Sequence, residues 1–456
     1  MANEANAAIG TQPVYDARTL GKPRMLVLGF QHMFAMFGAT VLVPALTGLS
    51  VSATLLFAGL GTLLFHLLSK GKVPAFLGSS FAFLGGYAAI APKLPDAGGN
   101  PTVANTEMLP YACFGVACAG LLYLVLSALF KVFGAKRVMA FFPPIVTGPI
   151  IISIGLTLSK SAVENCATHW WIALVAILVV IIANIWGKGM IKIIPILLGV
   201  IASYVAAALT GNVDFTQVTA APWIGLPFAG EDTVFYLLSH DPDSALLVSA
   251  VITILPIAIA TMVEHIGDMC AISSTCGRNY VQDPGLHRTL LGDGLATSLA
   301  SLFGAPANTT YGENTGVLAL SRVYDPRVIR IAAGLAILFS FCPKFAALVT
   351  AMPQATCGGV SLVLYGMISA VGVRNVVENR VDFTKSRNVI IAALIMVLSI
   401  GIAYSTAGAL ALGPVKLTGL AVGALVGILL NAVLPGKDYE FGTDLKGDTS
   451  SDLGRY

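Results

Sequence analysis

Four carboxylic acids stand out because they lie inside apolar stretches of the chain: Glu264, Asp268, Asp293 and Glu313. A charged carboxylate at the centre of a membrane span costs roughly 2.5–3.5 kcal/mol on insertion scales. We therefore expect these side chains to face a cavity, to pair, or to bind a proton. Glu264 and Asp268 are four residues apart, so they share one face of a helix. Two such neighbouring carboxyls raise each other's proton affinity, which is the property that a proton-coupled carrier needs.

A histidine in the first apolar stretch is a further candidate. His32 follows Gln31, and the pair is echoed in the second half by Glu264 and His265. This match predicts a buried network that joins His32 to the carboxylates. The predicted proton-coupling group is thus Glu264, Asp268, His32 and Asp293, although His32 and Asp293 also fit a purely structural role as hydrogen-bonded residues.

Composition identifies the environment of these residues. Hydrophobic residues make up 56% of the 456 residues and charged residues only 11%, whereas soluble domains carry about 25% charged residues. Apolar stretches of the length needed to cross a bilayer recur from Met25 to Leu434. We count fourteen candidate spans, of which the third and tenth are short or rich in Gly, Ser, Thr and Pro. The predicted fold class is an all-α polytopic membrane protein.

Several other functions are disfavoured by the same sequence. A net charge of +3 without a basic run gives no sign of a nucleic-acid partner. The seven cysteines lack paired metal spacing, so no metal or cofactor is expected. The residues around Glu264 and His265 lack the two-histidine spacing of a zinc enzyme, and no nucleophile has an evident partner. An enzyme is therefore not expected.

The distribution of basic residues predicts the orientation. With the N-terminus in the cytoplasm, all but four of the 26 Lys and Arg fall on the cytoplasmic side, as the positive-inside rule requires. The exceptions are Lys93, Lys160, Lys344 and Lys416. We expect cytoplasmic tails at 1–23 and 435–456 and an extracytoplasmic connection at 211–245. The first apolar stretch is too long for a signal-peptide core, so the N-terminus is expected to stay attached.

The fourteen spans are expected to form two inverted repeats of seven. Matching features recur in order in the two halves: Gln31-His32 with Glu264-His265, Pro74 with Pro306, and Phe142-Pro143 with Met352-Pro353. The weak third and tenth spans (residues 74–81 and 306–314) each suggest a short extended piece that turns into a half-helix. Matched interrupted spans of this kind point to a transporter binding site near the membrane midplane.

Several long motifs resemble those of the nucleobase–ascorbate transporter family over nearly the whole chain, most of all its bacterial uracil-transporting branch. The motifs are residues 30–32, 37–44, 74–81, 264–267, 283–288 and 308–314. The resemblance implies a core domain (24–133 plus 246–350), a gate domain (144–210 plus 353–434), a homodimer and elevator-like motion. It also implies proton symport in the bacterial inner membrane, driven by the proton gradient without a cofactor.

The resemblance also implies a set of substrate-binding residues. Glu264 and Glu313 would hydrogen-bond the base, and Phe81 and Gly312 would offer backbone N–H groups from the two half-helices. The pocket would be lined or closed by Ala39, Tyr311 and Tyr365.

The motifs give mixed indications of the substrate. Glu313 is typical of uracil carriers, where xanthine and urate carriers have Gln, and Ser321 replaces the usual Thr at the end of the motif. Asp268 and Asp293, by contrast, are typical of purine-transporting relatives. Uracil leads, and xanthine, uric acid or a broader set of pyrimidines is the alternative. A channel or an anion carrier of the same architecture remains as a rival, although the expected site is acidic and the carboxylates cluster in one half of the chain.

Overall fold

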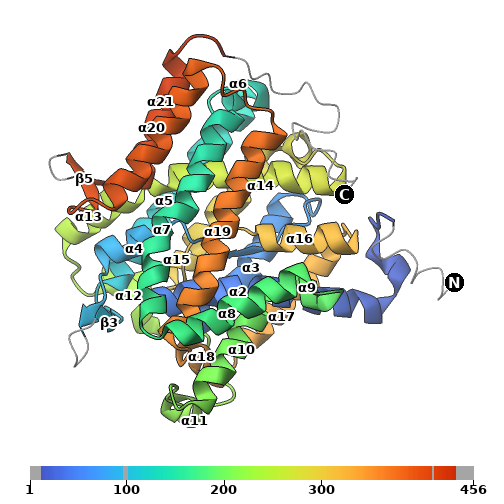
Figure 1. The fold of residues 1–456 in the computed structure, drawn as a ribbon, viewed down its shortest axis with the longest axis vertical. Helices are drawn as coiled ribbons and strands as arrows, with labels where there is room; N and C mark the ends of the chain where they lie inside the picture. Colours follow the sequence, from blue (N-terminus) through green and yellow to red (C-terminus); the bar gives the residue numbers. More distant parts are fainter. Residues whose placement is uncertain (1–11, 96–100, 413–414, 438–456) are drawn as a thin grey trace.

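The computed structural model describes residues 12–95, 101–412 and 415–437, and its regular structure is mainly helical (Figure 1). The long helices are α2 (Lys22–Thr47), α3 (Val51–Leu68), α5 (Leu109–Phe133), α7 (Pro144–Ala167), α14 (Ile257–Cys276), α19 (Gln354–Glu378) and α20 (Ser386–Ala403). Helices of intermediate length are α8 (Trp170–Ile185), α10 (Pro195–Leu209), α13 (Ser244–Ile254), α15 (Leu286–Leu302), α16 (Gly312–Ser321), α17 (Pro326–Ser340), α18 (Pro343–Thr350) and α21 (Gly419–Val433).

Short elements connect these helices. The short helices are η1 (Ala17–Leu20), α4 (Leu84–Ile90), α6 (Ala135–Met139), α9 (Met190–Ile193), α11 (Thr216–Ala220), η2 (Gly230–Asp232), α12 (Val234–Ser239) and η3 (Val281–Gly285). The strands are β1 (Leu77–Ser79), β2 (Leu94–Pro95), β3 (Pro101–Val103), β4 (Asn308–Thr310), β5 (Ala409–Leu412) and β6 (Val415–Thr418).

Local sequence signals set many helix ends. Ser50 caps α3 by accepting a hydrogen bond from the Ala53 N–H, and Asp243 caps α13 through the N–H groups of Ala245 and Leu246. These side chains satisfy backbone donors that a helix leaves without partners at its start. At the C-terminal end of α2, Gly48 adopts the left-handed conformation that commonly ends a helix.

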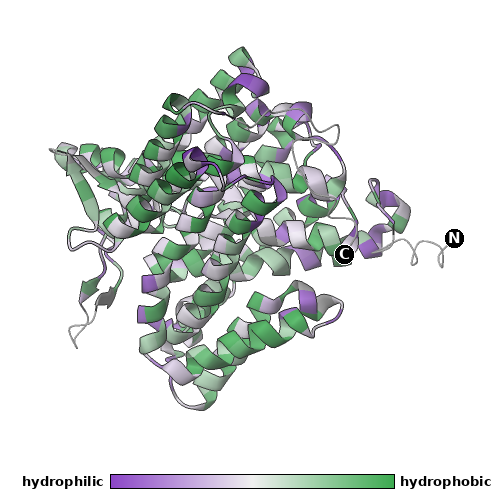
Figure 2. Ribbon diagram, turned by 45° about the horizontal axis from the view of Figure 1, so that its top comes forward, coloured by the Kyte–Doolittle hydropathy of each residue, from purple (hydrophilic) through white to green (hydrophobic). Residues whose placement is uncertain are grey.

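The apolar runs of the sequence become membrane-spanning helices. Within the described residues, seven helices are long and apolar enough to cross a membrane, with α13 and α14 together counted as one. The pair α17 and α18 is bent by 88° at a break, and it adds an eighth if it forms a single span. Hydrophobic residues dominate most of the helices (Figure 2). The chain is therefore a polytopic, mainly helical membrane protein. The expected fourteen spans include segments such as α8, α10 and α21, which are apolar but shorter than the 18 residues required for this count.

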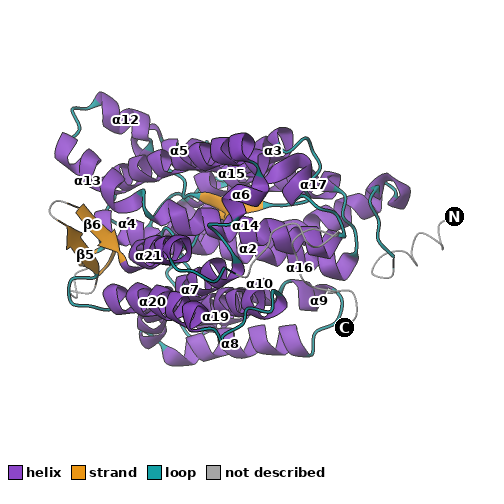
Figure 3. Ribbon diagram, turned by 90° about the horizontal axis from the view of Figure 1, so that it is seen from above, coloured by secondary structure: helices purple, strands orange, loops and turns teal. Residues whose placement is uncertain are grey.

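The helices pack in two groups. In one, α5 lies against α15, and α17 lies against both α2 and α3. In the other, α19 lies against α7 and α8, and α20 lies against α7 and α21. Seen from above, α3, α5, α15 and α17 form one side of the molecule and α8, α10, α19 and α20 the other (Figure 3).

The two expected extended pieces are present, and they pair with each other. Strands β1 and β4 are antiparallel, with Leu77 opposite Thr310 and Ser79 opposite Asn308. Both strands are fully buried. Their edges are bound by neighbouring helices: the Asn308 side chain donates to the Phe57 carbonyl of α3 at 2.9 Å, and the Thr297 hydroxyl of α15 donates to the Asn308 carbonyl at 2.8 Å. Irregular backbone at this depth is tolerated because protein groups satisfy it.

The N-terminal strap (residues 14–20) fastens to the first group of helices. Val14 pairs in parallel with Val323, just after α16. The Ala17 N–H donates to the Asp325 carboxylate at 2.7 Å, and the Arg327 guanidinium lies 2.9 Å from the Asp16 carboxylate. The strap therefore connects the end of α16 to the start of α17.

Candidate functional site

A cavity of about 270 Å³ is lined by helices of both groups together with α14, β4 and α16. This volume is close to the lower end of the range of small-molecule pockets, about 300 Å³. One wall comes from α14, β4 and the start of α16. The opposite wall comes from α8, α10, α19 and the connection between α8 and α10. Its polar and charged side chains are those of Asn184, Lys192, Glu264, Asp268, Thr309, Thr310 and Tyr311.

Two of the predicted carboxylates face this cavity together. Glu264 and Asp268 lie one turn apart on α14, both half-buried, and both line the cavity. The Thr310 hydroxyl donates a hydrogen bond to Asp268 Oδ2 at 2.7 Å. This bond connects the end of β4 to the carboxylate on α14. The site thus holds two acids that can accept hydrogen bonds or exchange protons with a bound molecule.

The strand β4 leads directly into a helix that starts at the cavity. Tyr311 is the N-cap of α16 with extended backbone angles, and Gly312 is the first residue of the helix. Both residues line the cavity. The first N–H groups of a helix have no partner within the helix, and they carry partial positive charge. Glu313 is the second residue of α16, and its side chain lies outside the described residues.

The segment after β1 is related but not identical. Helix α4 begins at Leu84, so Phe81 lies in the turn before the helix rather than in its first turn, and its carbonyl accepts from the Leu84 N–H at 3.1 Å. The Phe81 side chain lines the cavity. Its ring meets the Tyr365 ring edge-on, with centroids 5.7 Å apart.

Tyr311 connects the two strands at the site. Its hydroxyl donates to the Ser79 carbonyl at 2.9 Å, and the Ser79 hydroxyl donates to the Thr40 carbonyl of α2, also at 2.9 Å. The Tyr311 ring lies directly over Gly78, where an added Cβ would come within 2.5 Å of a ring atom. Gly78 therefore provides the space that the Tyr311 ring occupies.

Other predicted site residues lie outside the lining of this cavity. Asp293 on α15 is fully buried with His265, whose Nδ1 lies 3.0 Å from Asp293 Oδ2. His32 is fully buried beside Asn314: the Asn314 amide lies 3.2 Å from His32 Nδ1 and donates to the His32 carbonyl at 3.1 Å. Ala39 is buried in α2, and Tyr365 packs behind Phe81.

Sequence reasoning did not select several residues of the site. Thr310 lies within the motif that marked the tenth span, but its hydroxyl was not singled out. Asn184 and Lys192 lie at the end of α8 and in α9, and Lys192 served only as a cytoplasmic charge in the topology. The signal available was the break at Gly187 and Gly189, which interrupts the helical pattern between α8 and α10.

Comparisons with known proteins agree with this architecture. A model described as the Permease family matches residues 23–408. The uracil permease of Bacillus caldolyticus is 41% identical over 433 residues, which cover 93% of this chain and 94% of that protein. The uracil permease of Bacillus subtilis (strain 168) is 38% identical over 418 residues, covering 89% and 91%.

Solved structures share the fold at low sequence identity. SLC26A9 gives a TM-score of 0.63 at 14% identity, covering 92% of this chain and 66% of that chain. The transmembrane domain of a cyanobacterium bicarbonate transporter, BicA, gives a TM-score of 0.54 at 15% identity, covering 92% and 99%. This likeness concerns the fold alone.

Together these findings identify a multi-pass bacterial membrane transporter rather than an enzyme, as the sequence predicted. The chain belongs to the Permease family matched by that model, that is, to the nucleobase–ascorbate transporters whose motifs its sequence resembles.

Proposed function

We propose that this chain imports uracil, or a closely related nucleobase, across the bacterial inner membrane together with a proton. The observation that carries the proposal is the cavity in which Glu264 and Asp268 face the start of α16. Relatives that bear the name uracil permease support the choice of uracil. Xanthine, uric acid or a broader set of pyrimidines is the alternative, which Asp268 at this position favours.

The chemistry of the cavity suits a neutral base. Uracil presents ring N–H donors between carbonyl acceptors. A carboxylate accepts from the N–H groups, and a protonated carboxyl also donates to a carbonyl. Backbone N–H groups at the start of α16 are available for another carbonyl. Substrate and proton that bind at one site stabilise each other, and this reciprocity is the thermodynamic basis of coupling.

The proposed framework has fourteen segments in two inverted sevens. Its support is the repetition of helix contacts in the two halves. The contact of α3 with α17 corresponds to that of α15 with α5, and the contact of α8 with α10 corresponds to that of α20 with α21. The contact of α8 with α19 corresponds to that of α20 with α7. The paired strands β1 and β4 correspond to each other.

We further propose that the two groups of helices act as a core domain and a gate domain. The cavity lies between them, so sliding of the core domain along the gate domain would carry the substrate in elevator-type alternating access. A homodimer would hold the gate domains fixed in the membrane while the core domains move. The elevator-type motion and the homodimer are both inferred from the family resemblance.

The proposed orientation has both termini in the cytoplasm. Asp232 is exposed at the end of η2, just before α12. A cysteine at this position should react with an impermeant thiol reagent added outside intact cells. A cysteine at Lys136, exposed in α6, should react only after the cells are opened. The reverse pattern would refute the orientation. The chain has seven native cysteines, so labelling of the parent chain without an added cysteine measures the background reaction.

The decisive experiment for function is uptake of labelled uracil by cells that lack their own uracil transport. Unlabelled uracil, thymine, xanthine and uric acid are added in turn as competitors. We expect saturable uptake that uncouplers abolish and that uracil inhibits most strongly. Stronger inhibition by xanthine would select the alternative substrate, and uptake that does not saturate would indicate a channel.

A further inference from the structure

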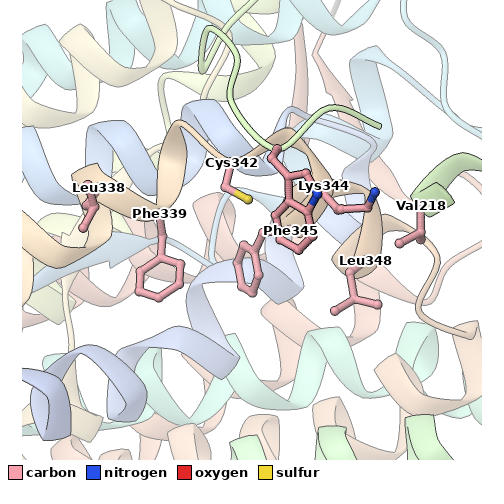
Figure 4. Close-up of a pocket in the computed structure, with 8 residues that line it drawn as sticks. Val218, Leu338, Phe339, Cys342, Lys344, Phe345 and Leu348 are labelled. Atoms are coloured by element: carbon pink, nitrogen blue, oxygen red, sulfur yellow. The ribbon is translucent and has the colours of Figure 1, made fainter. Parts of the chain in front are cut away.

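A second cavity lies away from the candidate site, at the break between α17 and α18 (Figure 4). Its volume is about 580 Å³. Apolar side chains line most of it, and those of Leu338, Phe339, Phe345 and Leu348 come from the two helices. The connection that follows α10 forms the other side with Val218 and Trp223. This groove is therefore built by two segments that lie more than a hundred residues apart in the sequence.

Backbone contacts hold the two sides of the groove together. The Lys344 N–H donates to the Pro222 carbonyl at 3.0 Å, and the Gly225 N–H donates to the Phe341 carbonyl at 3.1 Å. Gly225 lies so close to Pro343 that an added Cβ would come within 2.6 Å of the proline ring. The groove is thus a fixed feature of the fold and not a gap between independent segments.

One cation lies at the edge of this apolar groove. Lys344 Nζ lies over the Trp223 ring, 5.1 Å from its centroid. Within the described residues, no carboxylate lies at ion-pair distance from Lys344. The tryptophan ring satisfies only one side of the ammonium group. The remaining side is available to an external anion.

The connection beside the groove exposes large apolar side chains. Trp223, Ile224 and Leu226 are 72%, 85% and 82% exposed. Tryptophan is enriched at the boundary between bilayer and water, where one part of the ring is apolar and the other wet. In a membrane protein such a segment lies against lipid headgroups and the first part of the acyl chains. The groove opens beside this segment.

We propose that the groove binds an anionic phospholipid from the outer leaflet. One acyl chain lies along Leu338, Phe345 and Leu348, and the phosphate contacts the Lys344 ammonium beside Trp223. The apolar lining matches the acyl chain, and the Lys344 ammonium at the edge of the groove matches the headgroup charge.

Trp223 provides a direct probe of this site. The chain has four tryptophans, and the other three are Trp170, Trp171 and Trp186 on or directly after α8. Their replacement by phenylalanine leaves Trp223 as the only tryptophan emitter, and retained uptake shows that this parent variant is folded. It is reconstituted in vesicles that contain equal mole fractions of phosphatidylcholine and phosphatidylglycerol. In one preparation only the phosphatidylglycerol carries brominated acyl chains, and in the other only the phosphatidylcholine does.

We expect brominated phosphatidylglycerol to quench Trp223 more strongly than brominated phosphatidylcholine. The difference should correspond to about a fivefold preference, the size expected for one lysine near an anionic lipid. Lys344→Gln should abolish the preference, whereas Lys344→Arg should keep it. Lys160→Gln is the matched control, because Lys160 is also expected on the extracytoplasmic side but pairs with Glu164 on α7.

Three outcomes would overturn the proposal. Equal quenching by the two lipids would exclude an anionic headgroup. An unchanged preference in Lys344→Gln would exclude Lys344 as its contact. Protection of Trp223 from both brominated lipids would mean that protein, such as a second copy of the chain, covers the groove.

Discussion

Gly78→Ala is expected to damage the candidate site through a single added methyl group. In the structure, a Cβ at this position would lie 2.5 and 2.6 Å from two atoms of the Tyr311 ring and 2.7 Å from the Thr40 hydroxyl. Contacts this short force the ring to move. Tyr311 then loses its hydrogen bond to the Ser79 carbonyl, and the wall of the cavity that it forms shifts.

The size of the effect follows from these contacts. Overpacking of a tight interior costs about 1–3 kcal/mol, and loss of a buried hydrogen bond adds about 0.5–1.5 kcal/mol. Every 1.4 kcal/mol is a tenfold change in an equilibrium constant. If uracil binding requires the Tyr311 ring in its original position, binding must also restore that position. The overpacking cost of about 1–3 kcal/mol alone then weakens uracil binding roughly five- to 150-fold. Binding of labelled uracil to purified protein and thermal unfolding in detergent measure the two consequences separately.

A matched control lies in the same segment. At Gly85, in α4, no atom lies within 4 Å of an added Cβ, so Gly85→Ala should leave binding unchanged. A second test combines Gly78→Ala with Tyr311→Leu, which removes the ring from the clash. The combined loss should be smaller than the sum of the two single losses, because the two positions are in contact. Equal binding by Gly78→Ala and Gly85→Ala would refute the role assigned to Tyr311 and Gly78.

Three further outcomes are expected. Glu264→Gln should abolish uncoupler-sensitive accumulation of uracil. One proton that enters with a neutral base gains about 2.3 kcal/mol per 100 mV, which supports roughly fortyfold accumulation. Normal accumulation by this variant would exclude Glu264 as a proton-coupling residue. Glu313→Gln should weaken uracil uptake roughly five- to 150-fold, and competition by xanthine much less, because an amide NH₂ replaces the acceptor oxygen opposite a uracil ring N–H. Unchanged uracil binding would show that Glu313 does not contact the substrate. In the strap, the hydrogen bond from Arg18 holds the pKa of Asp16 well below its usual range, so its contribution to stability is present at neutral pH and is lost as the pH falls through the folded-state pKa. Asp16→Asn should lower the unfolding temperature slightly at neutral pH and not in acid, and adding Arg18→Gln should cost little more; fully additive losses would show that the two residues do not act as a pair.

Much of the architecture could be predicted because it depends on local pattern. Long apolar runs must become buried or lipid-facing helices, and this fixed the fold class. Pro74 and Pro306, each followed by small residues, predicted extended pieces where β1 and β4 are found. The spacing of Glu264 and Asp268 placed both side chains on one helix face, and both face the cavity.

The partners of these residues were decided only by tertiary structure. Adjacent side chains on a helix point about 100° apart, so Glu264 faces the cavity while its neighbour His265 faces α15 and meets Asp293. No local pattern shows which way α14 is turned. The pairing of β1 with β4, the bond from Thr310 to Asp268 and the approach of Lys192 to the cavity all join segments distant in sequence. Periodicity fixes which side chains share a face, but the packing of whole helices decides what that face meets.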